Sequence, residues 1–344
     1  MSDTGKPVGA RWRRRDVARA GFLSALACAS GTVVAQAPGR VWRIGYLGPP
    51  ADVAPKALDA FRDGLRALGY VDGRTVAIDY RWTTREGGQL LSPDELFAVA
   101  QELVARKVDV LAASVRPAIV AARKATASVP IVMMNGTDPV ESGLAESLAH
   151  PGGNVTGVTR FAAELIGKGF ELLVEAVPRA KRIALLSNGS GVVESLVIAN
   201  ARQAAQARGI DLQVLDVRLA SDLAAAFATM KTRLADGLIV TADGLFFAQR
   251  ARIAELAIAQ RLPTMVANTE VIEAGALLSY SSSNAENYRR AATFIDKILR
   301  GARPGDIPIE GPTTFELAIN LKTAKSIGVV LPQSLLLRAD RVVE

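Results

Sequence analysis

The sequence predicts an α/β protein of two lobes, each a parallel sheet flanked by helices. Short apolar runs typical of buried strands alternate with amphipathic helical segments along the chain after residue 40, as expected where helices connect parallel strands. The alternation falls into two similar series that meet near Val158. A length of 344 residues is also enough for two domains of ordinary size.

The first series predicts a sheet whose strands are each followed by a helix. The expected strands are 41–47, 75–80, 108–112 and 131–134, and the expected helices are 57–68, 94–106 and 117–126. Ser92 and Pro93 form a helix start, with a capping hydroxyl followed by proline in the first turn.

A polar turn, residues 135–139, follows the fourth expected strand. Asp138 before Pro139 indicates a capped helix, which we expect over residues 140–148, with Val140, Leu144 and Leu148 on one face. Residues 151–154 would end that helix, and residues 155–158 are expected to form another short strand.

The second series repeats this plan from residue 164 onward. The expected helices are 164–176, 192–208, 221–233 (capped by Ser221), 245–260 and 285–299. The expected strands are 182–187, 212–217, 237–241, 263–267, 276–281 and 313–320.

The N-terminus has the pattern of an export signal, predicted over residues 1–37. A basic region ends at Arg19, an apolar region follows, and residues 35–37 offer an Ala-Gln-Ala cleavage site. Arg14 and Arg15 are compatible with twin-arginine export. Cys28 offers the alternative of a lipidated N-terminus, which we place second because Ala25 stands where such signals usually have leucine. We therefore expect a periplasmic protein.

Charge and composition exclude several classes of function. The leader holds six of the cations and two of the acids, so the net charge of +7 falls to +3 without it, and no nucleic-acid partner is expected. The chain has a single histidine, His150, which excludes a histidine-based catalytic triad and a multi-histidine metal site. Residues 38–344 contain no cysteine. Since the Gly189-Ser190-Gly191 run is followed by Glu194 instead of a third glycine, no nucleotide cofactor is expected.

Polar residues follow the expected strands of both series and predict a small-molecule site. In parallel sheets ligands bind beyond the carboxyl ends of strands, close to helix N-termini. Capping and turn formation would also select several of these residue types. The candidate ligand-binding residues are Ser114, Arg116, Asn135, Thr137, Asp138, Asn188, Asp243 and Tyr280.

Arg116 differs from the other candidates because its position is electrostatically unfavourable. A cation at a helix N-terminus is repelled by the unpaired N–H groups of the first turn. An anion would relieve that repulsion, and either a ligand carboxylate or an internal Asp or Glu could supply it.

Three stretches carry a resemblance to a known family. They are DPVESGLAESLAHPGGNVTG (138–157), PTMVANTEVIEAGALLSY (263–280) and residues 288–340, which begin YRRAATFIDKILRG. Together they resemble the ABC-transporter substrate-binding proteins whose best-known members bind tryptophan or tyrosine. The family usually carries glycine- and threonine-rich residues where this chain has Ser114-Val115-Arg116.

The resemblance implies a type I periplasmic binding protein fold, in which the chain crosses a hinge three times. It places the crossovers near residues 158–161, 280–283 and 310–314. The lobes would then be 38–158 with about 283–312, and 159–282 with about 313–344.

The resemblance also implies the function: a non-enzymatic monomer that captures a small carboxylate-bearing molecule, such as an aromatic amino acid, and delivers it to an ABC permease in the inner membrane. A sensory binding protein coupled to a receptor is the alternative, and a cleft enzyme ranks below both. A transcription regulator would need a helix-turn-helix where this chain has an export signal.

The leader generates a test. Mass spectrometry of the protein isolated from the periplasm should find Pro38 as the first residue, without an acyl group, because cleavage is expected after Ala37. An acylated Cys28 at the mature N-terminus would contradict this expectation.

Overall fold

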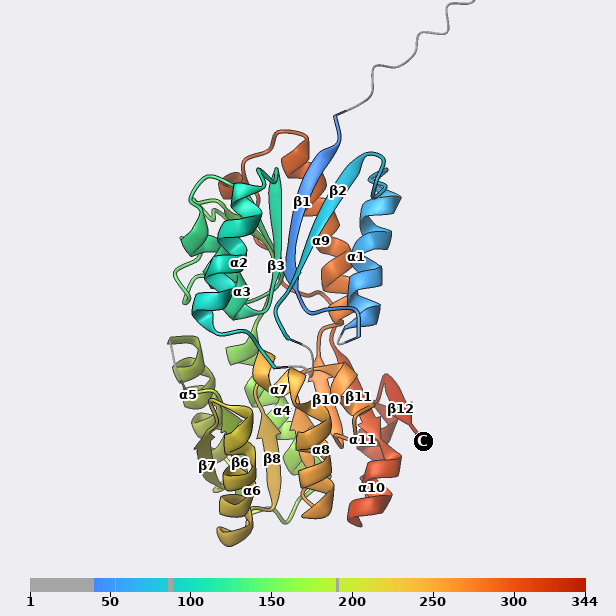
Figure 1. Ribbon diagram of the computed structural model, residues 1–344. Coiled ribbons are helices and arrows are strands. Elements are labelled where there is room, and N and C mark those ends of the chain that lie inside the picture. The colour runs from blue at the N-terminus through green and yellow to red at the C-terminus, as the bar shows by residue number, and fades with distance from the viewer. Residues whose placement is uncertain (1–39, 53, 86–88, 190–191) are drawn as a thin grey trace, which may run out of the picture. The chain divides into compact units, whose positions relative to one another are not determined.

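The computed structural model describes residues 40–344 except 53, 86–88 and 190–191 (Figure 1). The expected leader and its cleavage site lie outside the described residues. Residues 40–344 fold around two sheets with helices on both faces, so the predicted two-lobed α/β fold is confirmed. No helix in the described part of the chain is long and apolar enough to cross a membrane.

The first sheet has five parallel strands in the order β2-β1-β3-β4-β5. They are β1 (Trp42–Gly48), β2 (Val76–Trp82), β3 (Val110–Ser114), β4 (Ile131–Thr137) and β5 (Val155–Arg160). The helices packed on this sheet are α1 (Pro55–Ala67), α2 (Pro93–Ala105), α3 (Arg116–Ala125) and α9 (Asn284–Leu299). The predicted start of α2 is confirmed, because Ser92 and Glu95 form a reciprocal capping box.

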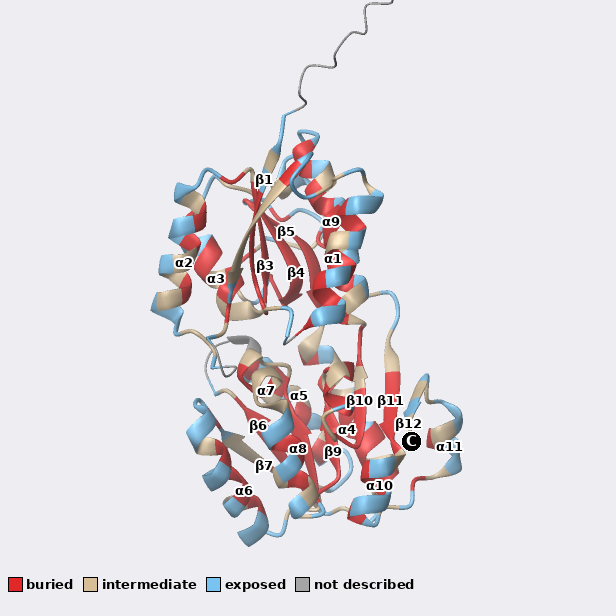
Figure 2. Cartoon of the chain, turned by 45° about the vertical axis from the view of Figure 1, so that its right-hand side comes forward, coloured by how far each residue is buried: buried red, intermediate tan, exposed pale blue. Residues whose placement is uncertain are grey.

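Both faces of the sheet are buried over β1, β3, β4 and β5, because side chains alternate across each strand while helices cover both sides, and the edge strand β2 is only partly buried (Figure 2). Ile44, Val110 and Val132 pack under α1 and α9. Leu47, Leu111 and Met133 pack under α2 and α3. The near-continuous apolar composition of these strands follows from that double burial.

The second sheet has seven strands in the order β12-β11-β10-β9-β8-β6-β7, and every pairing is parallel except that between β10 and β11. The strands are β6 (Arg182–Ser187), β7 (Asp211–Asp216), β8 (Gly237–Val240), β9 (Thr264–Val266), β10 (Leu278–Ser281), β11 (Glu316–Asn320) and β12 (Arg341–Val343). The helices of this part of the chain are α4 (Ala162–Ala176), α5 (Val192–Gln206), α6 (Leu223–Thr232), α7 (Gly244–Ala248), α8 (Arg250–Ala259), α10 (Leu321–Ile327) and α11 (Gln333–Leu337).

The chain passes between the two sheets three times. It leaves β5 at Arg160 and enters α4 two residues later. It returns from β10 to α9, which packs on α1 and the first sheet. It leaves again after Glu310, which still pairs with Val158, and enters β11.

The prediction of a helix over residues 140–148 is wrong. Those residues form turns, held by hydrogen bonds from Ser142 N to Asp138 O (3.0 Å) and from Leu144 N to Pro139 O (2.8 Å). Asp138 itself has φ of 42°, which is incompatible with capping a helix that follows it. The apolar Leu144 is buried nonetheless, so the periodic pattern was satisfied by a turn.

Two helix boundaries in the second series also differ from expectation. The cap of α6 is Asp222, because residues 220–222 form a separate 3₁₀ turn that includes Ser221. The helix expected over 245–260 is split at Gln249 into α7 and α8.

Strand β4 contains one more residue than its neighbours allow. Along β3, Ala113 and Ser114 pair with Met133 and Asn135, so Met134 is passed over. Along β5, Gly157 and Thr159 pair with Met133 and Gly136. Such a bulge bends a strand and changes where its later side chains point. It therefore decides the orientation of the last residues of β4.

Gly157 is required where β5 passes this bulge, and we expect Gly157→Ala to lower the free energy of unfolding by about 2–4 kcal/mol. Gly157 has φ of 124°, and an added Cβ would lie 2.3 Å from the carbonyl oxygen of Met133. Urea denaturation would measure the change. Gly153→Ala is the matched control, because its Cβ would meet no atom within 4 Å. Equal midpoints for the two variants would contradict this role.

Candidate ligand-binding site

A cleft lies where the carboxyl ends of β3, β4 and β5 face those of the second sheet. In the first sheet, Ser114 pairs with Asn135 and Thr137 pairs with Arg160, so the last residues of three neighbouring strands line up at one edge. All four side chains are buried. The parallel sheet thus collects polar groups from separate parts of the sequence at one place.

The polar section of the cleft is built mainly from these strand ends. We use that name for the part lined by Ser114, Arg116, Asn135, Thr137, Arg160, Asp243, Asn268, Asn284 and Tyr288. Tyr288 donates a hydrogen bond to the hydroxyl of Ser114 (2.5 Å). The amide of Asn135 donates to Asn284 (2.6 Å) and accepts from Asn287 (3.1 Å), both on α9. Asn135 therefore fixes β4 to the helix beside the second crossover.

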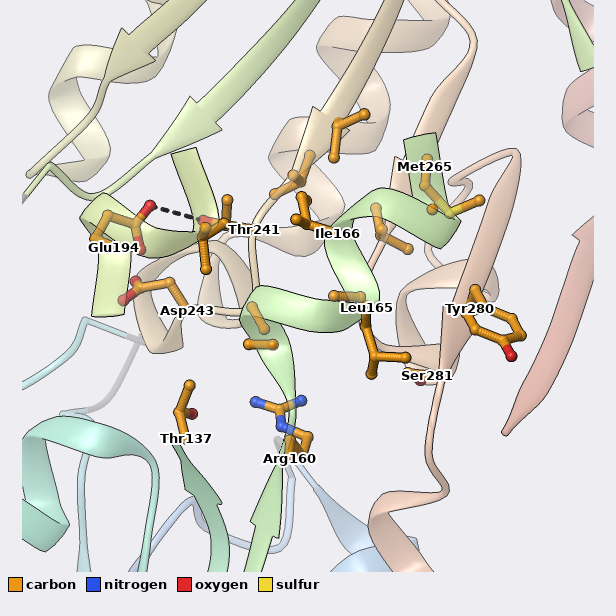
Figure 3. A pocket seen from close by; sticks show the side chains of 18 of the residues that line it. Thr137, Arg160, Leu165, Ile166, Glu194, Thr241, Asp243, Met265, Tyr280 and Ser281 are labelled. Atoms are coloured by element: carbon orange, nitrogen blue, oxygen red, sulfur yellow. Dashed lines mark hydrogen bonds between the residues drawn. The ribbon is translucent and has the colours of Figure 1, made fainter. Parts of the chain in front are cut away.

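The apolar section adjoins it and lies in the second lobe (Figure 3). It is lined by Leu165, Ile166, Gly169, Val197, Ile239 and Met265, with Tyr280 at its side. Arg116, Thr137, Arg160 and Asp243 line both sections, so the two are continuous. The ring of Tyr280 stacks on Phe315, with centroids 5.7 Å apart.

Two acids of the second lobe, the half-buried Asp243 and the buried Glu194, line the cleft beside these apolar groups. Asp243 is the N-cap of α7 and accepts a hydrogen bond from Leu245 N (2.7 Å). Glu194 on α5 accepts from the hydroxyls of Ser187 and Thr241. Burial raises the pKa of Glu194, and Asp243 raises it further, while the charge of Arg116 lowers it. Glu194 is thus an internal acid whose charge acts on Arg116.

Arg160 is the most deeply buried cation of the cleft. Its side chain is 8% exposed, and Nη1 donates to the amide oxygen of Asn268 across the lobes (2.7 Å). Burial lowers its pKa, whereas the charges of Glu270, Asp138 and Asp243 oppose that effect. Figure 3 shows the guanidinium at the foot of the pocket, with Glu194, Thr241 and Asp243 on one side and Met265 and Tyr280 on the other.

The predicted site residues fall into three groups. The structure brings Ser114, Arg116, Asn135, Thr137 and Asp243 together in the polar section, and Tyr280 lines the apolar section. Asn188 lines neither section and lies in an outer groove that adjoins them at Arg116 and Asp243 and also contains Arg218 and Leu219. Asp138 lines neither section, and the backbone N–H of Ala163 in the first turn of α4 lies close enough to its carboxyl to lower its pKa against the effect of burial. Direct ligand contact stays a prediction for each.

Val115, the residue before α3, has an unusual backbone conformation. It has φ of 63° and ψ of 141°, a region that β-branched residues strongly avoid. Glycine adopts such angles freely, which agrees with the glycine-rich composition that the family resemblance leads one to expect here. The strained residue lies between Ser114 and Arg116, both of which face the cleft.

Comparison with known proteins decides the family. A family model described as ABC transporter substrate binding protein matches residues 51–343. The chain belongs to this family. Its members bind solutes for a transporter and are not enzymes, as the sequence led us to expect.

Individual relatives are more distant. A tyrosine-binding protein of Clostridioides difficile (strain R20291) is 28% identical over 274 residues, which is 80% of this chain and 77% of that protein. A structure from Streptococcus pneumonia, an ABC domain in complex with L-Trp, has a TM-score of 0.80 at 24% identity over 88% of this chain and all of that one. A conserved domain protein from Vibrio cholerae has a TM-score of 0.81 at 24% identity, with the same coverage. The two structures show the fold.

Sequence reasoning missed Arg160 and Glu194. The sequence did contain a signal for Arg160. It is a cation that stands between a short expected strand and the expected helix of residues 164–176. The strand had been expected to stop at residue 158. Glu194 had been noted only as the residue that breaks a glycine pattern.

Asp138 generates a pH prediction. Burial raises its pKa from 3.8 to about 6, helped by Glu141 and Glu164, although the Ala163 N–H and Arg160 act in the opposite direction. An acid with a raised pKa in the folded state stabilises the protein less once it ionises. The free energy of unfolding should therefore fall as the pH rises from about 4 to about 6.

Asp138→Asn keeps an acceptor for Ala163 N but cannot ionise. At pH 7.5 it should be more stable than wild type by about 1–2 kcal/mol, and the difference should vanish below pH 4. Urea denaturation at a series of pH values would measure this. Asp306→Asn, at an exposed carboxylate, is the control. A variant less stable than wild type at every pH would contradict the prediction.

Proposed function

We propose that this protein captures a small zwitterionic carboxylate, an aromatic amino acid or a related compound, in the cleft between its lobes. It acts as a monomer in the periplasm and delivers the ligand to an ABC permease in the inner membrane. The export pattern of residues 1–37 supports the location. The permease as partner rests on the family.

The observation that carries the proposal is the balance of charge against apolar surface in the cleft. Arg116 and Arg160 are opposed by Asp243 and Glu194, so the lining charges sum to zero. A zwitterion presents the same balance, with a carboxylate for the cations and an ammonium for the acids. A dianion or a simple cation would leave charges of the cleft without partners, which is unfavourable in a partly buried site.

The apolar section sets the expected body of the ligand. Its walls are aliphatic side chains and Met265, and Gly169 leaves room on α4. Methionine is a flexible side chain that packs well against aromatic rings. The relatives described as tyrosine-binding and as a complex with L-Trp agree with such a ligand.

Closure of the lobes is the expected consequence of binding. Polar groups of both sheets line one cleft, so a ligand that contacts both sets stabilises the closed arrangement over the open one. The three connections between the sheets would carry the motion.

Ligand binding should stabilise the protein strongly. At 1,000 times its dissociation constant a ligand adds about 4 kcal/mol to the free energy of unfolding. We expect thermal shifts with L-tryptophan, L-tyrosine or related aromatic zwitterions that exceed those with sugars. If sugars stabilise the protein and no carboxylate does, the proposed ligand class is wrong.

The same samples test capture without chemistry. Small-angle scattering should show a smaller radius of gyration with ligand than without it, and chromatography should recover the ligand unchanged. Conversion to a product by purified protein would instead indicate an enzyme.

A further inference from the structure

We infer that Arg160, rather than Arg116, holds the carboxylate of the ligand. The inference rests on the proposed function and assigns one residue to one group of that ligand. It starts from a buried guanidinium that has hydrogen-bonding capacity left over.

Within the part of the chain that the structure describes, the buried Arg160 has no close ion-pair partner. Among the described residues, no carboxylate oxygen lies within 4.0 Å of its guanidinium, although pairs of that kind occur at the surface. A buried charge without a close partner is unfavourable by several kcal/mol. The nearby acids Glu270, Asp138 and Asp243 act on Arg160 from a longer distance.

The hydrogen bonds of the guanidinium leave one edge available. Nη1 is used by Asn268 (2.7 Å), whereas Nε is buried and has no partner among the described residues. A carboxylate satisfies N–H groups of arginine in a planar, charge-assisted contact that lysine cannot reproduce. The unpaired Nε–H is therefore what a ligand carboxylate would complete.

The position of Arg160 suits an amino acid better than that of Arg116. Arg160 is the last residue of β5, where it pairs with Thr137, and it lines both sections of the cleft. A carboxylate here would leave the ligand body free to enter the apolar section, and its ammonium could face Asp243. Arg116 also lines the outer groove, and its charge already acts on the buried acid Glu194.

The Asn268 contact adds a link to closure. Asn268 follows β9 in the second sheet. The guanidinium therefore belongs to a strand of one lobe and is hydrogen-bonded to an amide of the other lobe. A carboxylate bound to Arg160 would thus be positioned from both lobes at once. Arg160 is a ligand-binding residue in this scheme, and Asn268 is a positioning residue.

The experiment compares acids with their amides on wild type and on three variants. The probes are L-tryptophan, L-tyrosine, L-leucine and phenylacetate, each beside its carboxamide, with affinity measured by calorimetry. Wild type should bind at least one acid, and its amide about 30-fold more weakly or worse. Arg160→Gln should lose about the same factor for the acid and discriminate little between acid and amide.

The variants separate the two arginines. Arg116→Gln should keep the preference for acid over amide and weaken binding less than Arg160→Gln. Arg160→Lys should recover only part of the affinity, since it keeps the charge without the planar fork. Empty Arg160→Gln should melt at or above the wild-type temperature, because a buried unpaired charge is removed.

Each outcome decides something. If an acid binds wild type and Arg160→Gln equally, the inference is overturned while the proposed function stands. The same holds if wild type binds acid and amide equally, or if Arg116→Gln alone abolishes the preference. If wild type binds none of the eight probes, the proposed ligand class fails, and the inference that rests on it fails too.

Discussion

The parallel pairing of β3, β4 and β5 is the constraint on which the rest of the site depends. Because parallel strands all run in the same direction, the last residues of neighbouring strands lie together at one end of the sheet, whatever their separation in sequence. Ser114, Asn135, Thr137 and Arg160 are brought together in this way. The apolar layers on both faces hold the strands in register, so the polar ends are positioned by a core that they do not belong to.

The sequence was most informative where burial alone decides the structure. Runs such as residues 131–134 and 182–187 are apolar on both faces, and only a doubly covered strand needs that composition. It was least informative at strand ends. Residues 135–137 are polar and were taken for a turn, yet they continue β4 and are buried. The hydrogen-bond partners of Asn135 come from α9, about 150 residues later, which no local pattern can reveal.

Two errors concerning the site have a common cause. The segment after Asp138 has helical spacing of apolar residues, but its backbone is set by tertiary contacts: Asp138 has φ of 42°, and its N–H donates to the carbonyl oxygen of Arg160 at the end of β5. Arg160 was passed over because the strand seemed complete without it. In both cases the deciding interaction is made at the end of β4 or β5 by residues that are not neighbours in the chain, and such contacts depend on the fold as a whole.

The extra residue in β4 has a consequence for how this site can change over time. A bulge gives its strand a local bend and extra twist, so deleting one residue between Met133 and Gly136 would restore regular pairing and remove that bend. Thr137 would keep its pairing with Arg160, but the end of β4 that carries it would point in a different direction. Replacement of a strand-end side chain, by contrast, leaves the backbone in place. New ligand preferences are therefore accessible to this scaffold by point substitution, whereas length changes in the same four residues would redirect the end of β4 as a whole.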